Sequence, residues 1–194
     1  MPNRVFVAVM PPAPVIATLD ALVEPRRHHV GRRPHDSPLR WVAADHWHLT
    51  LAFLGAVAVA EVDQLVENLA QVAGRATPFR LGLGGAGCFP HPDAARVLWL
   101  GVRAGSPELA HLAGRTRTAA ARAGIAVEGG PYRPHLTLAR SNHGFRARAW
   151  LGVLDSFGDV DWVVDGFVLI DSELTRGGPR YRVVEEFRFG ANLR

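Results

Sequence analysis

Residues 48–51 read His-Leu-Thr-Leu, and residues 135–138 read His-Leu-Thr-Leu again. Each copy lies in a segment that we expect to form a β-strand, in which successive side chains point to opposite faces. The two leucines of a copy therefore share one face, which can pack into a core, while the histidine and the threonine share the other. The repeat predicts two similar lobes, each with a strand that presents an imidazole beside a hydroxyl.

The remaining segments mix expected strands and helices without strict alternation. The expected strands cover residues 4–10, 39–42, 48–54, 79–87, 96–102, 135–139, 162–174 and 180–189, the last two as a terminal hairpin, and the expected helices cover residues 14–23, 59–72, 106–123 and 145–154. This order favours an α+β fold rich in antiparallel sheet over a doubly wound parallel sheet. No composition shift marks a linker. We therefore expect residues 1–194 to form a single bilobal domain, with one H-x-T-x strand per lobe beside a central groove.

The composition is that of an ordinary globular chain, with 48% hydrophobic and 21% charged residues and a net charge of +4. All 22 basic residues are arginine, which suits phosphate oxygens but also fits a compositional bias of the genome. Cys88 is the lone cysteine, so a reducing cytoplasm is the expected compartment. The apolar run at the N-terminus stops at Pro11, too early for a signal peptide or a membrane span. We expect a cytoplasmic protein with no membrane partner.

Four side chains of the repeat form the candidate site. His48 and His135 are candidate proton-transfer groups, because a free imidazole has a pKa of about 6.5. Thr50 and Thr137 can donate hydrogen bonds to the non-bridging oxygens of a phosphate. Two histidines on facing strands could flank a phosphorus atom, as in-line displacement requires, and the scheme needs no metal and no cofactor.

These motifs resemble those of the 2H phosphoesterase superfamily, and most closely its bacterial and archaeal RNA 2′,3′-cyclic phosphodiesterases, which are similar to 2′–5′ RNA ligases. The resemblance extends in order over nearly the whole chain. The matching stretches read RVFVAVMPP, RWVAADHWHLTLAFLG, PFRLGLGGAGCFP, RVLWLGV, PYRPHLTLAR and DSELTRGGPRYRVV. The resemblance implies a two-lobed α+β fold with one motif per lobe lining a groove.

The resemblance also implies an activity. The expected substrate is an RNA that ends in a 2′,3′-cyclic phosphate, tRNA fragments included, and the expected product is an RNA 2′-phosphate. His48 would be the proton donor to the leaving 3′ oxygen, and His135 the proton acceptor that activates water. Thr50 and Thr137 would hold the phosphate. A 2′–5′ RNA-joining side activity and a monomeric state are further expectations.

Other residues and readings stay open at this point. Tyr132, Arg133 and Arg140 flank the second motif and are either substrate contacts or solvated strand-edge side chains. The Arg- and His-rich segment 25–38 is either a basic rim for RNA or a solvated loop. Two other functions compete with the first: a phosphodiesterase acting on a small cyclic nucleotide phosphate, and a non-catalytic RNA-binding module.

Two further patterns are weak. Residues 82–87 spell GxGxxG, but prolines follow instead of the helix that a dinucleotide site needs, so we expect strand and turn glycines. His46 and His48 lie two positions apart and could suggest a metal pair, yet no further ligands accompany them at suitable spacing.

Overall fold

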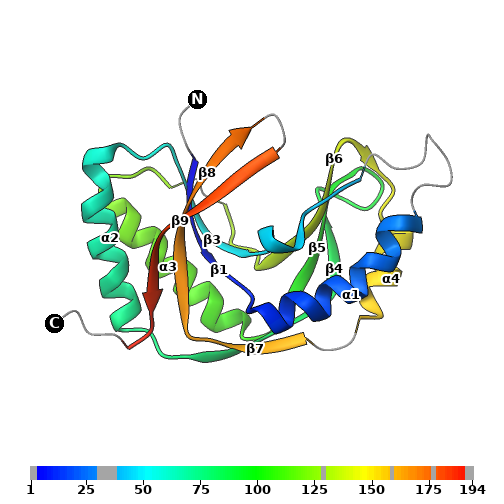
Figure 1. The fold of residues 1–194 in the computed structure, drawn as a ribbon, viewed down its shortest axis with the longest axis horizontal. Helices are drawn as coiled ribbons and strands as arrows, with labels where there is room; N and C mark the ends of the chain where they lie inside the picture. The colour runs from blue at the N-terminus through cyan, green and yellow to red at the C-terminus, as the bar shows by residue number, and fades with distance from the viewer. Residues whose placement is uncertain (1–3, 30–38, 128–129, 158–159, 176–177, 191–194) are drawn as a thin grey trace.

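The structure, a computed structural model, describes residues 4–29, 39–127, 130–157, 160–175 and 178–190. Its elements follow one another along the chain as Figure 1 shows. They are β1 (Arg4–Val9), α1 (Ala13–His29), β2 (Arg40–Trp41), the 3-10 helix η2 (Ala44–His46), β3 (Leu49–Gly55), α2 (Val59–Gly74), β4 (Phe79–Phe89), β5 (Ala95–Ala104), α3 (Ser106–Arg122), β6 (His135–Phe145), α4 (Arg148–Asp155), β7 (Val160–Val164), β8 (Gly166–Thr175) and β9 (Gly178–Arg188).

All nine described strands belong to one antiparallel sheet in the order β7-β4-β5-β6-β3-β1-β8-β9, with β2 beside β6. The order splits into two four-strand halves. The first lobe contains β3, β1, β8 and β9, and the second lobe contains β6, β5, β4 and β7. The expected α+β class and the antiparallel pairing are confirmed. The two halves are parts of one curled sheet, because β3 and β6 pair where the lobes meet.

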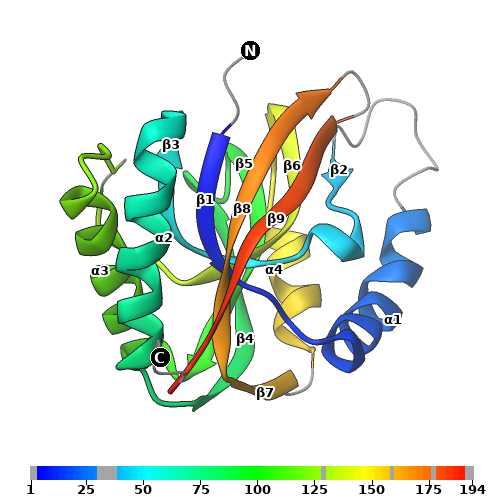
Figure 2. The same cartoon turned by 60° about the vertical axis from the view of Figure 1, so that its left-hand side comes forward.

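The helices are exchanged between the lobes. Helices α2 and α3 lie against the first lobe, while α1 and α4 lie against the second (Figures 1 and 2). Yet α1 follows β1 of the first lobe and contacts β7, and α3 follows β5 of the second lobe and contacts β3. Each lobe is therefore covered in part by a helix that follows, along the chain, a strand of the other lobe.

The main core lies between the helices and the sheet. The motif leucines Leu49, Leu51, Leu136 and Leu138 are all at most 2% exposed and belong to this core, which confirms the predicted leucine face. A smaller cluster of Phe6 with Ala8 and Ile170 lies on the opposite face of the sheet, because β1 alternates between the two clusters. No helix in the described ranges is long and apolar enough to cross a membrane.

The structure corrects the expected limits of two helices. Helix α1 continues through Pro25 to His29, so part of the segment 25–38 is helical; residues 30–38 lie outside the described residues. The helix expected from residue 145 begins at Arg148, because β6 continues to Phe145 and pairs there with β5.

The expected strand 162–174 is also wrong as a single strand. The chain breaks it between β7 and β8, and β7 pairs with β4 in the second lobe while β8 pairs with β1 in the first. Gly166 allows the crossing, because a Cβ there would lie 2.4 Å from the Phe187 carbonyl oxygen. The hairpin of β8 and β9 itself is present as predicted.

Candidate active site

The two repeated motifs meet where β3 pairs with β6. Leu49 lies opposite Leu136 in this antiparallel pair. The register therefore directs His48 toward Thr137 and Thr50 toward His135, around a local two-fold axis. The two histidines are diagonal neighbours, which in an antiparallel pair lie about 7–8 Å apart. The structure thus brings all four predicted side chains to one place.

Both imidazole rings are held in the same way by the backbone. Nδ1 of His48 lies 2.7 Å from the carbonyl oxygen of His46, and Nδ1 of His135 lies 2.7 Å from the carbonyl oxygen of Arg133. A carbonyl oxygen only accepts a hydrogen bond, so Nδ1 is the protonated nitrogen in both neutral rings. This leaves Nε2 of each ring as the nitrogen that can exchange a proton with a substrate.

Aromatic rings flank each histidine. The His48 ring lies 4.9 Å from Phe6 and 5.6 Å from Tyr181, measured between ring centroids. The His135 ring lies 5.1 Å from Phe89 and 5.8 Å from Trp99. These aromatic residues come from other strands and lie far from the motifs in sequence. They limit how each imidazole can turn about its anchoring hydrogen bond.

Trp99 can lie beside His135 because β4 has a glycine beneath the indole. A Cβ on Gly87 would lie 2.0 Å from two carbon atoms of the Trp99 ring. Gly87 is the last glycine of the GxGxxG pattern, and all of that pattern lies within β4, with no helix directly after it. The predicted role of these glycines in the strand is confirmed, and Gly87 has a specific task in it.

The environment lowers the pKa of both histidines. Burial is the main cause for His48, whose pKa falls to about 4, and the nearby charges of Arg140 and His135 lower it further. Burial and then the charge of Arg140 also lower the pKa of His135, against the raising effect of the Arg133 carbonyl. Both pKa values therefore lie below that of a free imidazole, and the unperturbed pKa expected from sequence does not apply here.

A bulge at the last residue of each motif changes the face on which the following residues lie. On β3, Val7 and Ala8 pair with Ala52 and Thr50, which leaves Leu51 without a partner residue. On β6, the neighbouring residues Leu98 and Trp99 of β5 pair with Ala139 and Thr137, which leaves Leu138 without a partner residue. Such an extra residue reverses the alternation of faces.

The bulges therefore place Phe53 and Arg140 on the face of the histidines. Both residues stand five positions after their histidine, at the end of HLTLAF and HLTLAR. Phe53 is 48% exposed and its ring lies 6.2 Å from Phe6. Arg140 is exposed and influences the pKa of both histidines. The site is thus symmetric up to this position, where one lobe supplies an aromatic ring and the other a cation.

A cavity of about 290 Å³ opens between the lobes at the motifs. Thr50 and Phe53 of β3 line it together with Phe89 of β4 and His135 of β6. The remaining lining residues include Tyr132, Arg133 and Arg117. Of the four predicted side chains, Thr50 and His135 line this cavity, whereas His48 and Thr137 do not. Its volume is close to the lower limit of ordinary ligand sites.

Tyr132 and Arg133 also have backbone roles that sequence reasoning missed. The Tyr132 hydroxyl donates a hydrogen bond of 3.1 Å to the carbonyl oxygen of Thr50, and burial raises its pKa above the usual range. Tyr132 therefore joins the segment before β6 to β3. Arg133 is exposed, and its carbonyl group orients His135.

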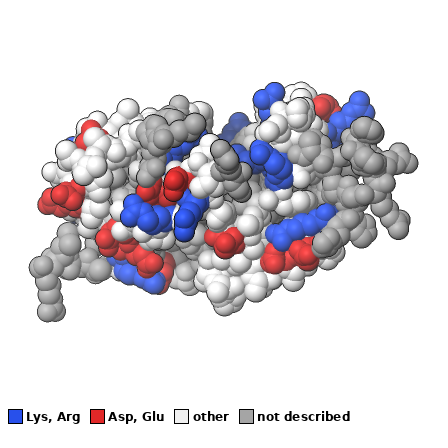
Figure 3. Space-filling model, turned by 45° about the horizontal axis from the view of Figure 1, so that its top comes forward, with Lys and Arg blue, Asp and Glu red and all other residues white. Residues whose placement is uncertain are grey.

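The threonines and the surface charge complete the description. Thr50 and Thr137 are half-buried, and no residue in the described ranges hydrogen-bonds to either hydroxyl. In the same ranges, no three His, Cys, Asp or Glu side chains are grouped so that they could hold a metal ion. Acidic and basic side chains are interspersed on the face shown in Figure 3, so no uniform positive field covers it.

Comparison with known proteins places this arrangement in a family. Residues 11–176 match the model of the 2′-5′ RNA ligase superfamily. The chain belongs to the 2′-5′ RNA ligase superfamily. An Escherichia coli K12 protein named RNA 2′,3′-cyclic phosphodiesterase is 35% identical to this chain over 93% of each of the two chains. An Aquifex aeolicus protein of the same name is 34% identical over 78% of this chain and 82% of its own.

Solved structures of similar sequence have the same fold. A Thermus thermophilus protein superposes with a TM-score of 0.76 at 30% identity, covering 98% of this chain and all of its own. Escherichia coli LigT in complex with 3′-AMP superposes with a TM-score of 0.72 at 31% identity, covering 97% of this chain and 99% of its own. The fold predicted from the resemblance is confirmed over nearly the full length.

Proposed function

We propose that the protein hydrolyses the 2′,3′-cyclic phosphate end of an RNA to a 2′-phosphate, using His48 and His135 for acid–base catalysis. The observation that carries the proposal is the pair of Nδ1-anchored imidazoles on diagonal positions of one strand pair. Relatives named RNA 2′,3′-cyclic phosphodiesterase, 34–35% identical over most of the chain, support this substrate.

In the proposed reaction, water attacks phosphorus and the bond from phosphorus to the 3′ oxygen breaks. His135 takes a proton from the water through Nε2, and His48 gives a proton to the 3′ oxygen through Nε2. Acid–base catalysis of this kind accelerates a reaction typically ~10²–10⁴-fold. The hydroxyls of Thr50 and Thr137 donate hydrogen bonds to the non-bridging oxygens, where negative charge builds up.

The low pKa of His48 makes its role as acid depend on the substrate. A neutral His48 in the free protein cannot donate a proton, and burial, its main perturbation, favours the neutral form. A bound phosphate brings a negative charge next to the ring and offsets the charge of Arg140. That charge raises the pKa of His48, so protonation and substrate binding are coupled.

The contrast between Phe53 and Arg140 gives the two sides of the phosphate different surroundings. Phe53 offers an exposed ring that can stack on the terminal base, a contact worth roughly 1–3 kcal/mol per base. Arg140 offers a guanidinium that can contact the phosphate or cover the base from the other side. The two side chains would thus orient the nucleotide, so that the 3′ oxygen faces the acid.

The protein supplies both histidines from one chain, so the proposed active species is a monomer. We expect it to act in the cytoplasm, tRNA fragments being one source of cyclic ends. The same two histidines could run the reaction in reverse with a 5′ hydroxyl in place of water, which would join RNA ends through a 2′–5′ bond.

The decisive test uses an oligonucleotide with a 2′,3′-cyclic phosphate end, incubated with the protein and EDTA. We expect a 2′-phosphate product, and its loss in His48→Asn and in His135→Asn, which keep a donor near the position of Nδ1. His143→Asn, an exposed histidine on the same strand β6, serves as the matched control and should keep full activity. A 3′-phosphate product, or turnover in either site variant, would contradict the assignment.

A further inference from the structure

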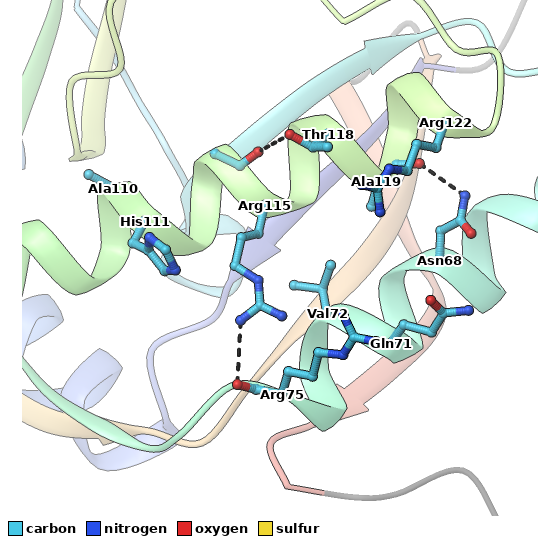
Figure 4. Close-up of a pocket in the computed structure, with 11 residues that line it drawn as sticks. Asn68, Gln71, Val72, Arg75, Ala110, His111, Arg115, Thr118, Ala119 and Arg122 are labelled. Carbon is cyan, nitrogen blue, oxygen red and sulfur yellow. Dashed lines mark hydrogen bonds between the residues drawn. The ribbon is translucent and has the colours of Figure 1, made fainter.

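A second cationic hollow lies on the outside of the first lobe, between α2 and α3. It has a volume of about 620 Å³. Figure 4 shows the side chains of the two helices that surround it, and most of them are exposed. Its basic residues are Arg75 at the end of α2 and His111, Arg115 and Arg122 on α3. The hollow is an open groove, unlike the enclosed and mostly apolar pockets that bind small molecules.

A smaller hollow of about 390 Å³ lies next to the groove between α2 and α3 and continues it. The two share Arg75, His111 and Arg115 in their linings. The second also contains Phe79 and Phe189, whose rings stack at 6.4 Å with an interplanar angle of 19°. We call the two together the outer trough. Both rings are half-buried and pack in part against the core. Basic side chains beside aromatic rings are a combination by which proteins bind single-stranded nucleic acid.

The arginines of the outer trough are among those of the described residues that have no carboxylate partner. Arg80, Arg148 and Arg188 each pair with an aspartate at 2.8–3.0 Å. By contrast, within the described part of the chain, no carboxylate pairs with the guanidinium groups of Arg75, Arg115 and Arg122.

Other features of the lining support an anionic occupant. Glu108 is the only acid among the described residues that line the trough. Arg115 donates a hydrogen bond to the Arg75 carbonyl oxygen, which holds one cation at the centre of the trough. Uncompensated like charges repel one another, so an anion bound among them is favoured.

Helix α3 connects the trough to the catalytic cavity. Arg117 lines that cavity and contacts the Gly130 carbonyl oxygen at 3.3 Å, whereas Arg115 lies in the trough. Residues two apart in an α-helix point about 200° apart, so α3 carries basic residues on two opposite sides. An RNA strand that leaves the cavity past Arg117 needs to cross only the width of one helix, about 10–12 Å, to reach the trough.

We propose that the outer trough binds the single-stranded RNA backbone upstream of the cyclic end. The arginines contact its phosphates, and Phe79 and Phe189 receive a base. The trough proposal rests on the proposed function in one respect, the identity of the bound RNA as one with a cyclic end. The consequence is that the enzyme prefers a cyclic end on a long RNA over the same end on a mononucleotide.

The test compares two substrates in one set of variants. The first is a cyclic mononucleotide, and the second is an oligonucleotide of about 16 nucleotides with a cyclic end, the upper range of such binding sites. Arg75→Gln with Arg122→Gln should raise KM for the oligonucleotide roughly two- to thirtyfold, the range for two exposed ion pairs. It should leave kcat and KM for the mononucleotide unchanged. The slope of log affinity against log salt should fall by about 0.7 for each phosphate that the variant no longer binds.

Gly114 provides a matched pair of variants inside the trough. A Cβ at this α3 position meets nothing within 4 Å, so larger side chains fit without disturbing the fold. Gly114→Glu should weaken oligonucleotide binding more than Gly114→Gln, which has the same size and no charge. Equal effects of the two would refute the electrostatic part of the proposal.

Binding is also measured directly, by fluorescence anisotropy with a labelled oligonucleotide ending in a 3′ hydroxyl. This readout needs no turnover, so an inactive protein that binds through the trough would refute only the proposed function. The trough proposal fails if the arginine variant binds and processes the oligonucleotide like the original protein. It also fails if both substrates lose activity equally, or if AMP alone displaces the oligonucleotide at low concentration, which would indicate a nucleotide site.

Discussion

Gly87→Ala tests whether the ring of Trp99 positions His135. The added Cβ would lie 2.0 Å from Cζ2 and Cη2 of Trp99, where unstrained carbon atoms stay about 3.5–4.0 Å apart. The indole must therefore move by about 1.5 Å or more, and His135 and Phe89 lie next to it. Overpacking of this kind costs about 1–3 kcal/mol of stability. A displacement of about 1 Å at a reacting group costs about 10²-fold in rate.

The assay measures kcat on a cyclic-phosphate substrate and the free energy of unfolding in urea. We expect kcat to fall about 100-fold in a protein that remains folded. Gly152→Ala is the control, because a Cβ on this α4 glycine meets nothing within 4 Å. In a Trp99→Ala background, Gly87→Ala should lower kcat only slightly further, because both substitutions act through the same contact between residues 87 and 99. Unchanged kcat in the single Gly87→Ala variant would refute the positioning role of Trp99.

Four further predictions concern the proton-transfer and phosphate groups. His48 should titrate near pH 4 in NMR of the free protein, and at a higher pH when inorganic phosphate is bound; an unchanged pKa would exclude it as the acid. Because its folded pKa lies below the 6.5 of the unfolded chain, the unfolded state binds this proton more tightly. Acidification from pH 6.5 to 4 should therefore cost up to about 3 kcal/mol of stability through His48. Urea titration should find a correspondingly smaller loss in His48→Asn, where the lowered pKa of His135 still contributes. Arg140→Gln should raise the pKa of both His48 and His135, since its charge lowers each, and a further decrease would contradict this placement. Thr50→Val and Thr137→Val should each reduce kcat by roughly 10²-fold while the urea midpoint stays nearly constant, and normal kcat would remove that hydroxyl from the mechanism.

The parts of the site that depend on local strand geometry could be predicted from the sequence. Alternation of faces within HLTL placed the leucines in the core and the histidine beside the threonine, and the burial of Leu49 and Leu136 agrees. Two identical motifs also indicated two related halves. These predictions succeed because a strand has a period of two whatever it pairs with.

The parts that depend on pairing between distant strands could not be predicted. The bulges at Leu51 and Leu138 arise from pairing with β1 and β5. Neither motif alone therefore shows on which face of the sheet Phe53 and Arg140 lie. Alignment of HLTLAF with HLTLAR would have drawn attention to that position. The aromatic neighbours of the histidines come from other strands, and only the tertiary fold reveals them. The break between β7 and β8 falls at Asp165-Gly166, a dipeptide typical of turns, and was missed because apolar residues dominate on both sides of it.

The exchange of helices has a consequence for how the chain can be divided. A fragment that ended after β3 would contain α1 without the strand that α1 covers, and would lack α3, which covers β3. The C-terminal hairpin likewise completes the sheet that β1 begins, and it delivers Tyr181 to the His48 ring. Each lobe is thus stabilised by a helix that the chain supplies from beside the other lobe. We therefore expect the two lobes to unfold as a single cooperative unit, so that proteolytic removal of either end disorders both histidines together.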